Sequence, residues 1–302
     1  MNKTAKWLVI IFSVLAFLGV CFGIVIYVFL KRVGERTETV TSGYGAKIAV
    51  VELRGVITSS EDVVRQLKNY RENSSIKGIL LRVDSPGGGV VASQEIYEEV
   101  KKIRDGGKPV VVSMGALAAS GGYYVSCGAT RLVANRGTLT GSIGVISEFL
   151  QLKEALDKLG VGIKTIKSGK LKDSGSSTRK MTEEDEKYFQ QLMDDVHKQF
   201  IAVVEKERHI NHKDAVAIAD GRVFTGEQAL RAGLVDTIGT YEDAVHVVGG
   251  LAGISGEPSI VKERRRRSLW DGLFTDMEES LTDLKQELME KPALSYRFTG
   301  PY

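Results

Sequence analysis

The chain has little of the chemistry on which many enzymes and secreted proteins depend. Its 302 residues include only two cysteines, Cys21 and Cys127. Two cysteines imply no disulfide framework and say little about the redox compartment. The net charge is only +3. This small excess argues against a dedicated nucleic-acid binder, and we expect no nucleic acid among the partners.

Histidine is equally scarce, with four residues in the whole chain. None of them lies in a glycine-rich loop or at the end of a predicted core strand: His197, His209, His212 and His246. A Ser-His-Asp triad therefore has no support in the sequence. The other general base for a serine nucleophile is a lysine whose pKa is low enough to leave it neutral near pH 7.

Charge is absent from one long apolar stretch, Trp7–Leu30. As a helix it would cover about 36 Å, enough to span a bilayer core of roughly 30 Å. It is longer than the apolar core of a cleavable signal peptide and has no small-residue cleavage site. We predict a cytoplasmic terminus over residues 1–6 and an uncleaved single-pass anchor over residues 7–30. Basic residues flank both ends of the anchor, so charge alone does not fix its orientation.

Beyond a polar linker over residues 31–46, strands alternate with helices up to about residue 261. This alternation predicts an α/β domain with parallel βαβ units over residues 47–261. Strands are predicted at 47–53, 76–83, 109–113, 131–134, 143–147 and 161–166, and helices at 59–70, 90–103, 151–159, 182–207, 213–218 and 241–251. The apolar stripe of the helix over 182–207 indicates core or subunit interface.

Two small-residue motifs follow neighbouring strands. Residues 84–89 (DSPGGG) follow the strand over 76–83 and are predicted to form a loop. Residues 118–122 (AASGG) follow the strand over 109–113. Because ligand sites in such folds lie at the carboxyl ends of the strands, we expect both motifs at one edge of the sheet.

Ser120, within the second of these motifs, has two interpretations. A serine among glycine and alanine at a strand-to-helix junction is sterically open and close to unpaired N–H groups, as a nucleophile requires. Serine is also a preferred N-cap residue. The candidate lysines for its base, Lys170 and Lys172, lie in a loop directly after a predicted strand, and an ordinary solvated basic loop is the alternative there. Spacing does not distinguish between the two lysines.

The region after the domain, residues 262–302, begins with a basic run, KERRRR. Apolar residues then recur at alternating spacings of four and three, as in a short heptad seam: Trp270, Phe274, Met277, Leu281, Leu284 and Leu288. This amphipathic helix would pack on a sister subunit or lie on the membrane surface.

Several motifs in order resemble the short, single-repeat form of the signal peptide peptidase A family. They are the DSPGGG loop, ALAASGGYYVSCGA, TGSIGVI, IKSGKLKDSGSSTR and ADGRVFTGEQALRAGLVDTIG, which together cover roughly Ile48 to Leu251. The resemblance implies membrane-anchored serine proteases with a Ser-Lys dyad. It also implies a fold like that of the ClpP and crotonase proteins, built from repeated ββα units.

The resemblance also implies the roles of individual residues. Ser120 would be the nucleophile and Lys172 the general base. Gly87 and Gly121 would supply the oxyanion donors, and Ser142 would orient the lysine. One departure is that the family loop commonly reads Gly-Ser-Pro after the lysine, whereas this chain has Gly-Ser-Ser at residues 175–177.

The function that the resemblance implies is that of a membrane-anchored serine endopeptidase that digests remnant signal peptides and other membrane-associated peptides, with its catalytic domain outside the cytoplasm. The partners would be cleaved signal peptides, membrane lipid through the anchor, and further copies of the chain in a homo-oligomer. Lys172 would then act on a neighbouring subunit. No metal or cofactor is required. A crotonase-like acyl-CoA enzyme and a catalytically silent membrane scaffold are the alternatives.

Overall fold

A computed structural model describes residues 17–20, 22–23, 36–42, 45–265 and 295–298. By compactness the chain divides into residues 1–39 with 262–289, and residues 40–261 with 290–302. The second unit holds the predicted peptidase domain. The predicted terminus over 1–6, nearly all of the anchor and the whole heptad seam lie outside the described residues.

The short described pieces of the predicted anchor, residues 17–20 and 22–23, are helical. Their large apolar side chains, such as Phe17 and Phe22, are exposed. Within the described ranges, no helix is both long and apolar enough to span a bilayer.

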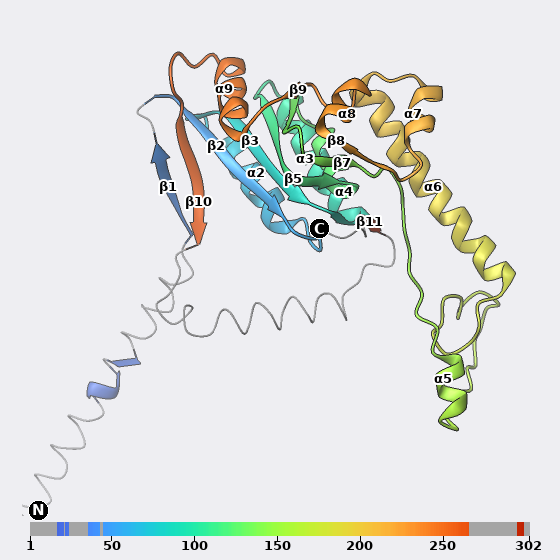
Figure 1. Cartoon of the computed structure of the whole chain (residues 1–302). Coiled ribbons are helices and arrows are strands. Elements are labelled where there is room, and N and C mark those ends of the chain that lie inside the picture. Colours follow the sequence, from blue (N-terminus) through green and yellow to red (C-terminus); the bar gives the residue numbers. More distant parts are fainter. Residues whose placement is uncertain (1–16, 21, 24–35, 43–44, 266–294, 299–302) are drawn as a thin grey trace, which may run out of the picture. The chain divides into compact units, whose positions relative to one another are not determined.

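One mixed sheet organises the domain (Figure 1). Its strands follow the order β1-β10-β2-β3-β5-β6-β9, and β7 joins β5 to β8. The central strands β2, β3, β5, β6 and β9 are parallel, and β8 is antiparallel to β7. The bounds are β1 Arg36–Ser42, β2 Lys47–Arg54, β3 Ile76–Ser85, β5 Val110–Ala119, β6 Arg131–Ala134, β7 Leu139–Gly141, β8 Val223–Thr225, β9 Thr237–Ile238 and β10 Ser259–Arg265.

A second, two-stranded sheet pairs β4 (Gly87–Gly89) with β11 (Ser295–Arg297) in antiparallel order. The helices are α2 Glu61–Glu72, α3 Val90–Asp105, α4 Gly121–Ser126, α5 Lys153–Lys158, α6 Glu183–Arg208, α7 His212–Ile218, α8 Gly226–Arg231 and α9 Tyr241–Leu251. The domain is thus α/β with a parallel central sheet, as predicted.

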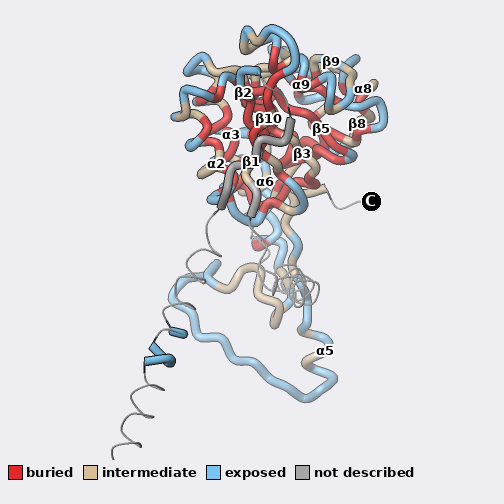
Figure 2. The backbone as a smooth tube through the Cα atoms, turned by 90° about the vertical axis from the view of Figure 1, so that its left-hand side faces the viewer, coloured by how far each residue is buried: buried red, intermediate tan, exposed pale blue. Residues whose placement is uncertain are grey.

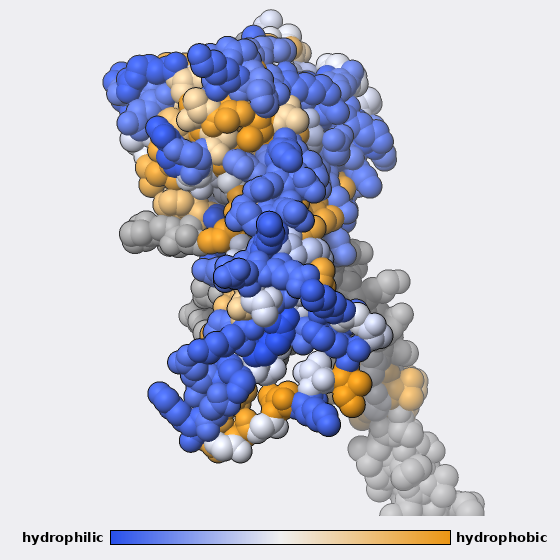
Figure 3. Space-filling model, turned by 90° about the vertical axis from the view of Figure 1, so that its right-hand side faces the viewer, coloured by the Kyte–Doolittle hydropathy of each residue, from blue (hydrophilic) through white to orange (hydrophobic). Residues whose placement is uncertain are grey.

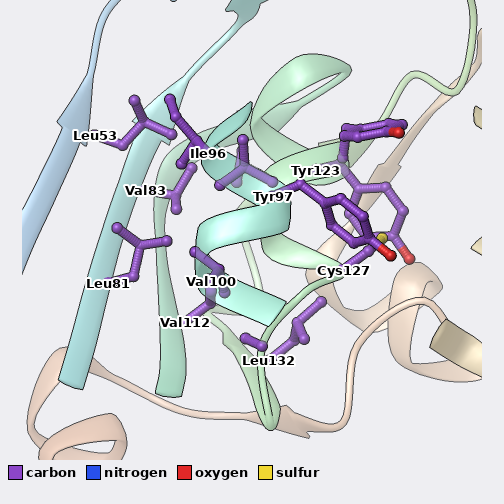
Figure 4. Packing of buried hydrophobic residues seen from close by; sticks show 14 of the residues in the cluster. Leu53, Leu81, Val83, Ile96, Tyr97, Val100, Val112, Tyr123, Cys127 and Leu132 are labelled. Atoms are coloured by element: carbon purple, nitrogen blue, oxygen red, sulfur yellow. The ribbon is translucent and has the colours of Figure 1, made fainter. Parts of the chain in front are cut away.

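Alternate residues of the central strands face opposite layers, as the period of two requires. On β3, Leu81 and Val83 belong to the large apolar cluster that also holds side chains of α2, α3 and α4. Figure 4 shows this packing, with Ile96 and Val100 of α3 against the strands. Leu80 faces the other cluster, which holds side chains of α9. Helices therefore bury both faces of the sheet.

Several predicted boundaries were wrong. Residues 84–89 are not simply a loop, because β3 runs to Ser85 and residues 87–89 form β4. Residues 161–166 form no strand, and the strand predicted at 143–147 is replaced by the earlier β7. Residues 36–42, within the predicted linker, form β1, and β10 crosses residue 261, so the bounds predicted for the linker and the domain stay predictions.

Residues 150–180 form an arm that extends from the domain. Figures 1 and 2 both show the arm, which includes α5, away from the sheet and beside the first turns of α6. Most of its residues are exposed. Phe149, directly before the arm, packs on α6, with its ring centroid 4.3 Å from that of Phe189.

Candidate active site

Ser120 occupies a sharp turn between β5 and α4. Its backbone has φ 52° and ψ −116°, outside the regions that a side chain ordinarily adopts. An N-cap residue normally has extended backbone and accepts a bond from the helix, but the Ser120 side chain accepts no such bond. Strained backbone of this kind concentrates at functional sites. The geometry therefore favours the nucleophile over the cap.

Neighbouring strands hold this turn in place. The Ser120 N–H donates to the carbonyl oxygen of Gly141 at 2.7 Å, and the Tyr124 N–H donates to the Ser120 carbonyl at 2.8 Å. Within α4, the Tyr123 hydroxyl donates to the Leu234 carbonyl at 2.9 Å. The turn is therefore fixed by bonds to β7, within α4 and to the segment before β9.

The DSPGGG motif lies against the same turn, as predicted. In the register of β3 and β5, Ser85 is opposite Ala118. A Cβ on Gly121 would lie 2.5 Å from Ser93 Oγ and 3.1 Å from the Gly88 nitrogen. Only glycine lets the start of α4 approach β4 this closely. As the first residue of α4, Gly121 has no acceptor for its N–H within the helix.

Gly87 differs from the sequence-based expectation in one respect. Its φ is +93°, and a Cβ there would lie 2.5 Å from the Gly121 nitrogen, so the residue is where the prediction requires. Its N–H, however, donates to Ser85 Oγ at 3.0 Å. In this arrangement the Gly87 N–H is engaged with Ser85 rather than directed at an oxyanion.

Ser142 also lies beside Ser120. It is buried and has a positive φ of 50°. Its neighbour Gly141 is opposite Ala119 in the pairing of β7 with β5. The Ser142 N–H donates to the Arg222 carbonyl at 2.9 Å, which fixes the strained loop. Ser120, Gly121, Gly87 and Ser142 thus form one cluster at the sheet edge.

Lys172 is not part of that cluster within a single chain. It is exposed in a turn of the arm, where its N–H donates to the Gly169 carbonyl at 3.2 Å. Lys170, the other candidate, lies in the same loop and pairs with Glu184 of α6. The fold therefore presents both lysines to solvent, on a segment that leaves the domain of Ser120.

A charged network holds the loop that carries Lys172. Arg179 donates to Asp173 at 3.0 Å and to Asp185 at 2.5 Å. Lys167 also pairs with Asp173, and the Ser174 hydroxyl donates to Asp185. Hydrogen bonds from Arg179 and Lys167 lower the pKa of Asp173 to about 2. Both carboxylates therefore stay charged at neutral pH, and they fix the loop to the first turn of α6.

No strand was predicted at β11, which pairs with the glycine strand of the site. Ser295–Arg297 pairs in antiparallel order with Gly87–Gly89. Gly87 and Gly88 in turn lie against Gly121, the residue after Ser120. The pairing joins residues about two hundred positions apart, so no local pattern reveals it. The alternation of Tyr296 and Phe298 with polar residues in SYRF was the available signal. Among the described residues, no group of three or more His, Cys, Asp or Glu side chains is arranged to hold a metal ion.

Comparisons with known proteins match this site and fold. The profile of peptidase family S49 matches residues 102–255, and that of Clp protease matches residues 47–146. A Synechocystis protein that bears the name of a protease is 44% identical over 210 residues, covering 69% of this chain and 75% of its own length.

Two further relatives are similar over the same region. An Enterococcus faecium protein that bears the name of a signal peptide peptidase is 39% identical over 222 residues, which are 69% of this chain and 64% of the relative. Protease 4 of Haemophilus influenzae is 34% identical over 209 residues, which are 66% of this chain and 34% of the relative. The chain thus spans less than two thirds of the length of these two relatives.

Proposed function

Because the chain belongs to peptidase family S49 and is a serine-type peptidase, we propose that it is a membrane-anchored endopeptidase that digests remnant signal peptides. Ser120 is the nucleophile and Lys172 the general base. The name of the Enterococcus faecium relative supports the substrate class. Membership in a peptidase family argues against the two alternatives, a crotonase-like acyl-CoA enzyme and a catalytically silent membrane scaffold.

The observation that carries this proposal is the strained backbone of Ser120 beside β4. A turn of this shape places the hydroxyl at the carboxyl edge of the sheet, next to the first N–H groups of a helix, as in other serine hydrolases, and Ser120 is buried there in the single chain. Ser120 Oγ attacks the peptide carbonyl while a neutral lysine accepts its proton. The oxyanion that forms is stabilised by backbone N–H groups. Removal of one such donor typically costs about 10²–10³-fold in rate.

Gly121 and Gly88 are the donors that this geometry favours. The Gly121 N–H has no acceptor in its helix, whereas the Gly87 N–H is engaged with Ser85. Gly88 is the next residue after Gly87, and its backbone nitrogen lies 3.1 Å from where a Cβ on Gly121 would be. Gly121 and Ser142 keep the roles that the resemblance implies. On β4, the proposed oxyanion donor is Gly88 instead of Gly87.

Lys172 acts in trans in this proposal. The arm carries it away from Ser120 of the same chain and leaves apolar side chains at its surface, as Figure 3 shows. They include Leu159, Ile163 and Ile166. Contact with a second copy would bury these side chains and bring Lys172 to a neighbouring Ser120. The anchor over residues 7–30 would hold the assembly at the cell membrane, with the peptidase domains outside the cytoplasm.

The test combines a serine-reactive fluorophosphonate probe with cleavage of a fluorogenic peptide. We expect Ser120→Ala to abolish labelling and cleavage, and Lys172→Ala to lower cleavage at least 10³-fold. Lys170→Ala is the matched control, because Lys170 lies in the same exposed loop, and it should retain cleavage within about twofold. Full activity of Lys172→Ala would overturn the dyad.

Mixing the two inactive variants tests the shared site. Oligomers that contain both Ser120→Ala and Lys172→Ala chains can assemble some complete sites if the base comes from a neighbour. We expect part of the activity to return. If the subunits are shown to exchange between oligomers and no peptidase activity returns, the base does not act in trans.

A further inference from the structure

The strand that leads to Ser120 contains extra residues just before its end. The register of β3 against β5 shifts there, between the pairs Val83–Met114 and Ser85–Ala118. Across the shift β3 advances by two residues and β5 by four. Asp84 of β3 is therefore opposite three residues of β5, the bulge over residues 115–117. A bulge bends its strand and redirects the residues that follow it, and bulges are common beside active sites.

The bulge is also the place where β5 changes its neighbouring strand. Before it, residues 111–113 pair with β6, and from residue 117 to residue 119 the strand pairs with β7. The bond from the Ser120 N–H to the Gly141 carbonyl continues this second pairing. Because side chains alternate along a strand, loss of one residue from the bulge would turn the later side chains of β5 to the other face. The bulge therefore determines where Ser120 lies.

Two side chains bond the backbone of the bulge. Asp84 Oδ1, on the facing strand, accepts from the Leu117 N–H at 3.1 Å. The Thr138 hydroxyl, directly before β7, donates to the Gly115 carbonyl at 2.7 Å. Leu117 and Gly115 are both buried, and a buried backbone group requires a partner. Asp84 and Thr138 thus supply partners that a regular strand takes from its neighbours.

Asp84 also fills the space inside the bulge. A Cβ on Gly115 would lie 2.6 Å from Asp84 Cγ, so a side chain at that position would displace the carboxylate. The Asp84 carbonyl accepts from the Gly55 N–H at 3.0 Å, which holds its backbone on the side of β2. Asp84 is the first residue of the DSPGGG motif. The glycines of this motif lie against Gly121, which follows Ser120, and its aspartate holds the strand that precedes Ser120.

We propose that Asp84 is a positioning residue for Ser120. Its carboxylate fixes the Leu117 N–H, and through it the end of β5 and the turn that carries the nucleophile. Thr138 supports the same bulge from the segment before β7. Neither side chain takes part in the bond changes of the reaction. The inference rests on the proposed function, since it assigns the groups that hold the proposed nucleophile in place.

The expected effect is on the chemical step. Loss of the bond to Leu117 would move Ser120 Oγ relative to the peptide carbonyl without removing a group that binds the peptide. A displacement of about 1 Å in such a geometry can cost about 10²-fold in rate. The bond needs only an acceptor oxygen, which an asparagine side chain also offers. Asp84 is half-buried, so the amide NH₂ of an asparagine there can reach water.

Cleavage of a fluorogenic peptide and the rate of fluorophosphonate labelling test this role in the full chain. We expect Asp84→Ala to lower kcat and the labelling rate about 10²-fold, with KM changed by less than about threefold. Asp84→Asn should stay within about threefold of the wild type in all three. Thr138→Val, which keeps the shape of the side chain and removes its hydroxyl, should lower kcat about tenfold.

Thr130→Val is the matched control. Thr130 Oγ1 accepts from the Val110 N–H at 3.1 Å, at the start of β5 and far along the strand from the bulge. This variant loses one side-chain bond to the same strand, so it measures the effect of reduced stability alone. We expect its kcat and labelling rate to match those of the wild type. Melting curves of all the variants accompany the kinetics.

Hydrogen exchange examines the bulge independently of activity. Peptic fragments that contain residues 115–119 should take up deuterium faster in Asp84→Ala and Thr138→Val than in the wild type or in Thr130→Val. Asp84→Asn should retain the protection of the wild type. Equal protection in the wild type and in Asp84→Ala would show that Asp84 does not hold the bulge.

The outcomes separate this inference from the proposed function. An active wild type whose Asp84→Ala and Thr138→Val variants keep kcat would overturn the positioning role and leave the proposed function intact. Equal losses in Asp84→Asn and Asp84→Ala would also overturn it, because the amide oxygen still accepts the Leu117 N–H. A wild type that is neither labelled nor able to cleave the peptide would instead refute the proposed function.

Discussion

The backbone N–H of Ser120 donates to the carbonyl oxygen of Gly141, 2.7 Å away. This bond ties the strained turn of the proposed nucleophile to the end of β7. Gly141 itself has φ +77°, and a Cβ there would lie 2.6 Å from the Phe224 ring. The shape of the turn that carries Ser120 therefore depends on a glycine some twenty residues away in the sequence.

Gly141→Ala should destabilise the fold by about 1–3 kcal/mol and lower peptidase activity on the order of tenfold. The positive φ disfavours a side chain, and relief of the contact with Phe224 would shift the acceptor of the Ser120 N–H. Thermal denaturation and peptide cleavage measure the two effects. Gly137→Ala, in the turn before β7 with open space around it, should change neither, and equal effects of both substitutions would contradict this account.

Arg179→Met should reduce activity without changing probe access to Ser120, because Arg179 holds the loop of Lys172 through Asp173 and Asp185. The loop should also become sensitive to trypsin at Lys167 and Lys170. Lys180→Met is the matched control: it removes the adjacent cation, whose partner Glu154 is as exposed as Lys180 itself. Unchanged cleavage by the Arg179 variant would show that this network does not position the lysine.

The same network predicts a dependence on acid. Hydrogen bonds from Arg179 and Lys167 lower the pKa of Asp173 to about 2 from an ordinary value of 3.8, and those from Arg179 and Ser174 lower the pKa of Asp185 further. A lowered pKa contributes stability that is complete above the ordinary value and is lost as the pH falls through the folded value. The loop should therefore resist trypsin-like cleavage unchanged down to about pH 4. Cleavage of the loop by an acid-stable protease should increase as the pH falls from about 4 to 2. An increase already at pH 5 to 6 would contradict the pairing of Asp173 and Asp185 with Arg179.

Cys127 should resist alkylation in the native protein. Burial raises the pKa of its thiol to about 12 from 9.0, so the reactive thiolate is roughly a thousandfold rarer at pH 8, and the side chain is buried besides. In a Cys21→Ser background, iodoacetamide should label Cys127 only after denaturant is added. Rapid labelling of the folded protein would show that the core around α4 opens readily.

Ile166→Asp should weaken assembly and lower peptide cleavage together. Ile166 is 90% exposed on the arm and Leu159 is 76% exposed, and a charge there would oppose burial against a second copy. Sedimentation velocity gives the oligomeric state, and Lys164→Asp, a polar position on the same stretch, is the control. Loss of assembly with full activity would argue against a base supplied by a neighbour.

Local patterns predicted much of this molecule. The alternation of strands and helices gave the α/β class, and the positions of DSPGGG and AASGG at strand ends correctly predicted their meeting, which the pairing of Ser85 with Ala118 confirms. The capping box that Thr182 and Asp185 form at the start of α6 is a local feature of the same kind. These features depend on side-chain periodicity and on residues close in sequence.

The errors involve partners distant in sequence. Gly87–Gly89 forms a strand because Ile57 and the β11 segment supply its backbone bonds, and a glycine run carries no sign of either partner. Residues 161–166 have the β-branched composition of a strand, but in the part of the chain that the structure describes they pair with no strand and form no regular element. The separation of Lys172 from Ser120 likewise depends on the path of the arm, which loop composition does not define.

The position of β4 between two partners has a consequence for solubility. With the C-terminal segment in place, Gly88 has Ile57 on one side and Tyr296 on the other. Without that segment β4 would be an unprotected sheet edge, and such edges readily recruit extended chains from other molecules. The residues around Tyr296 thus also shield the protein from edge-to-edge aggregation, in the way that other folds cover an exposed strand with a loop or a helix.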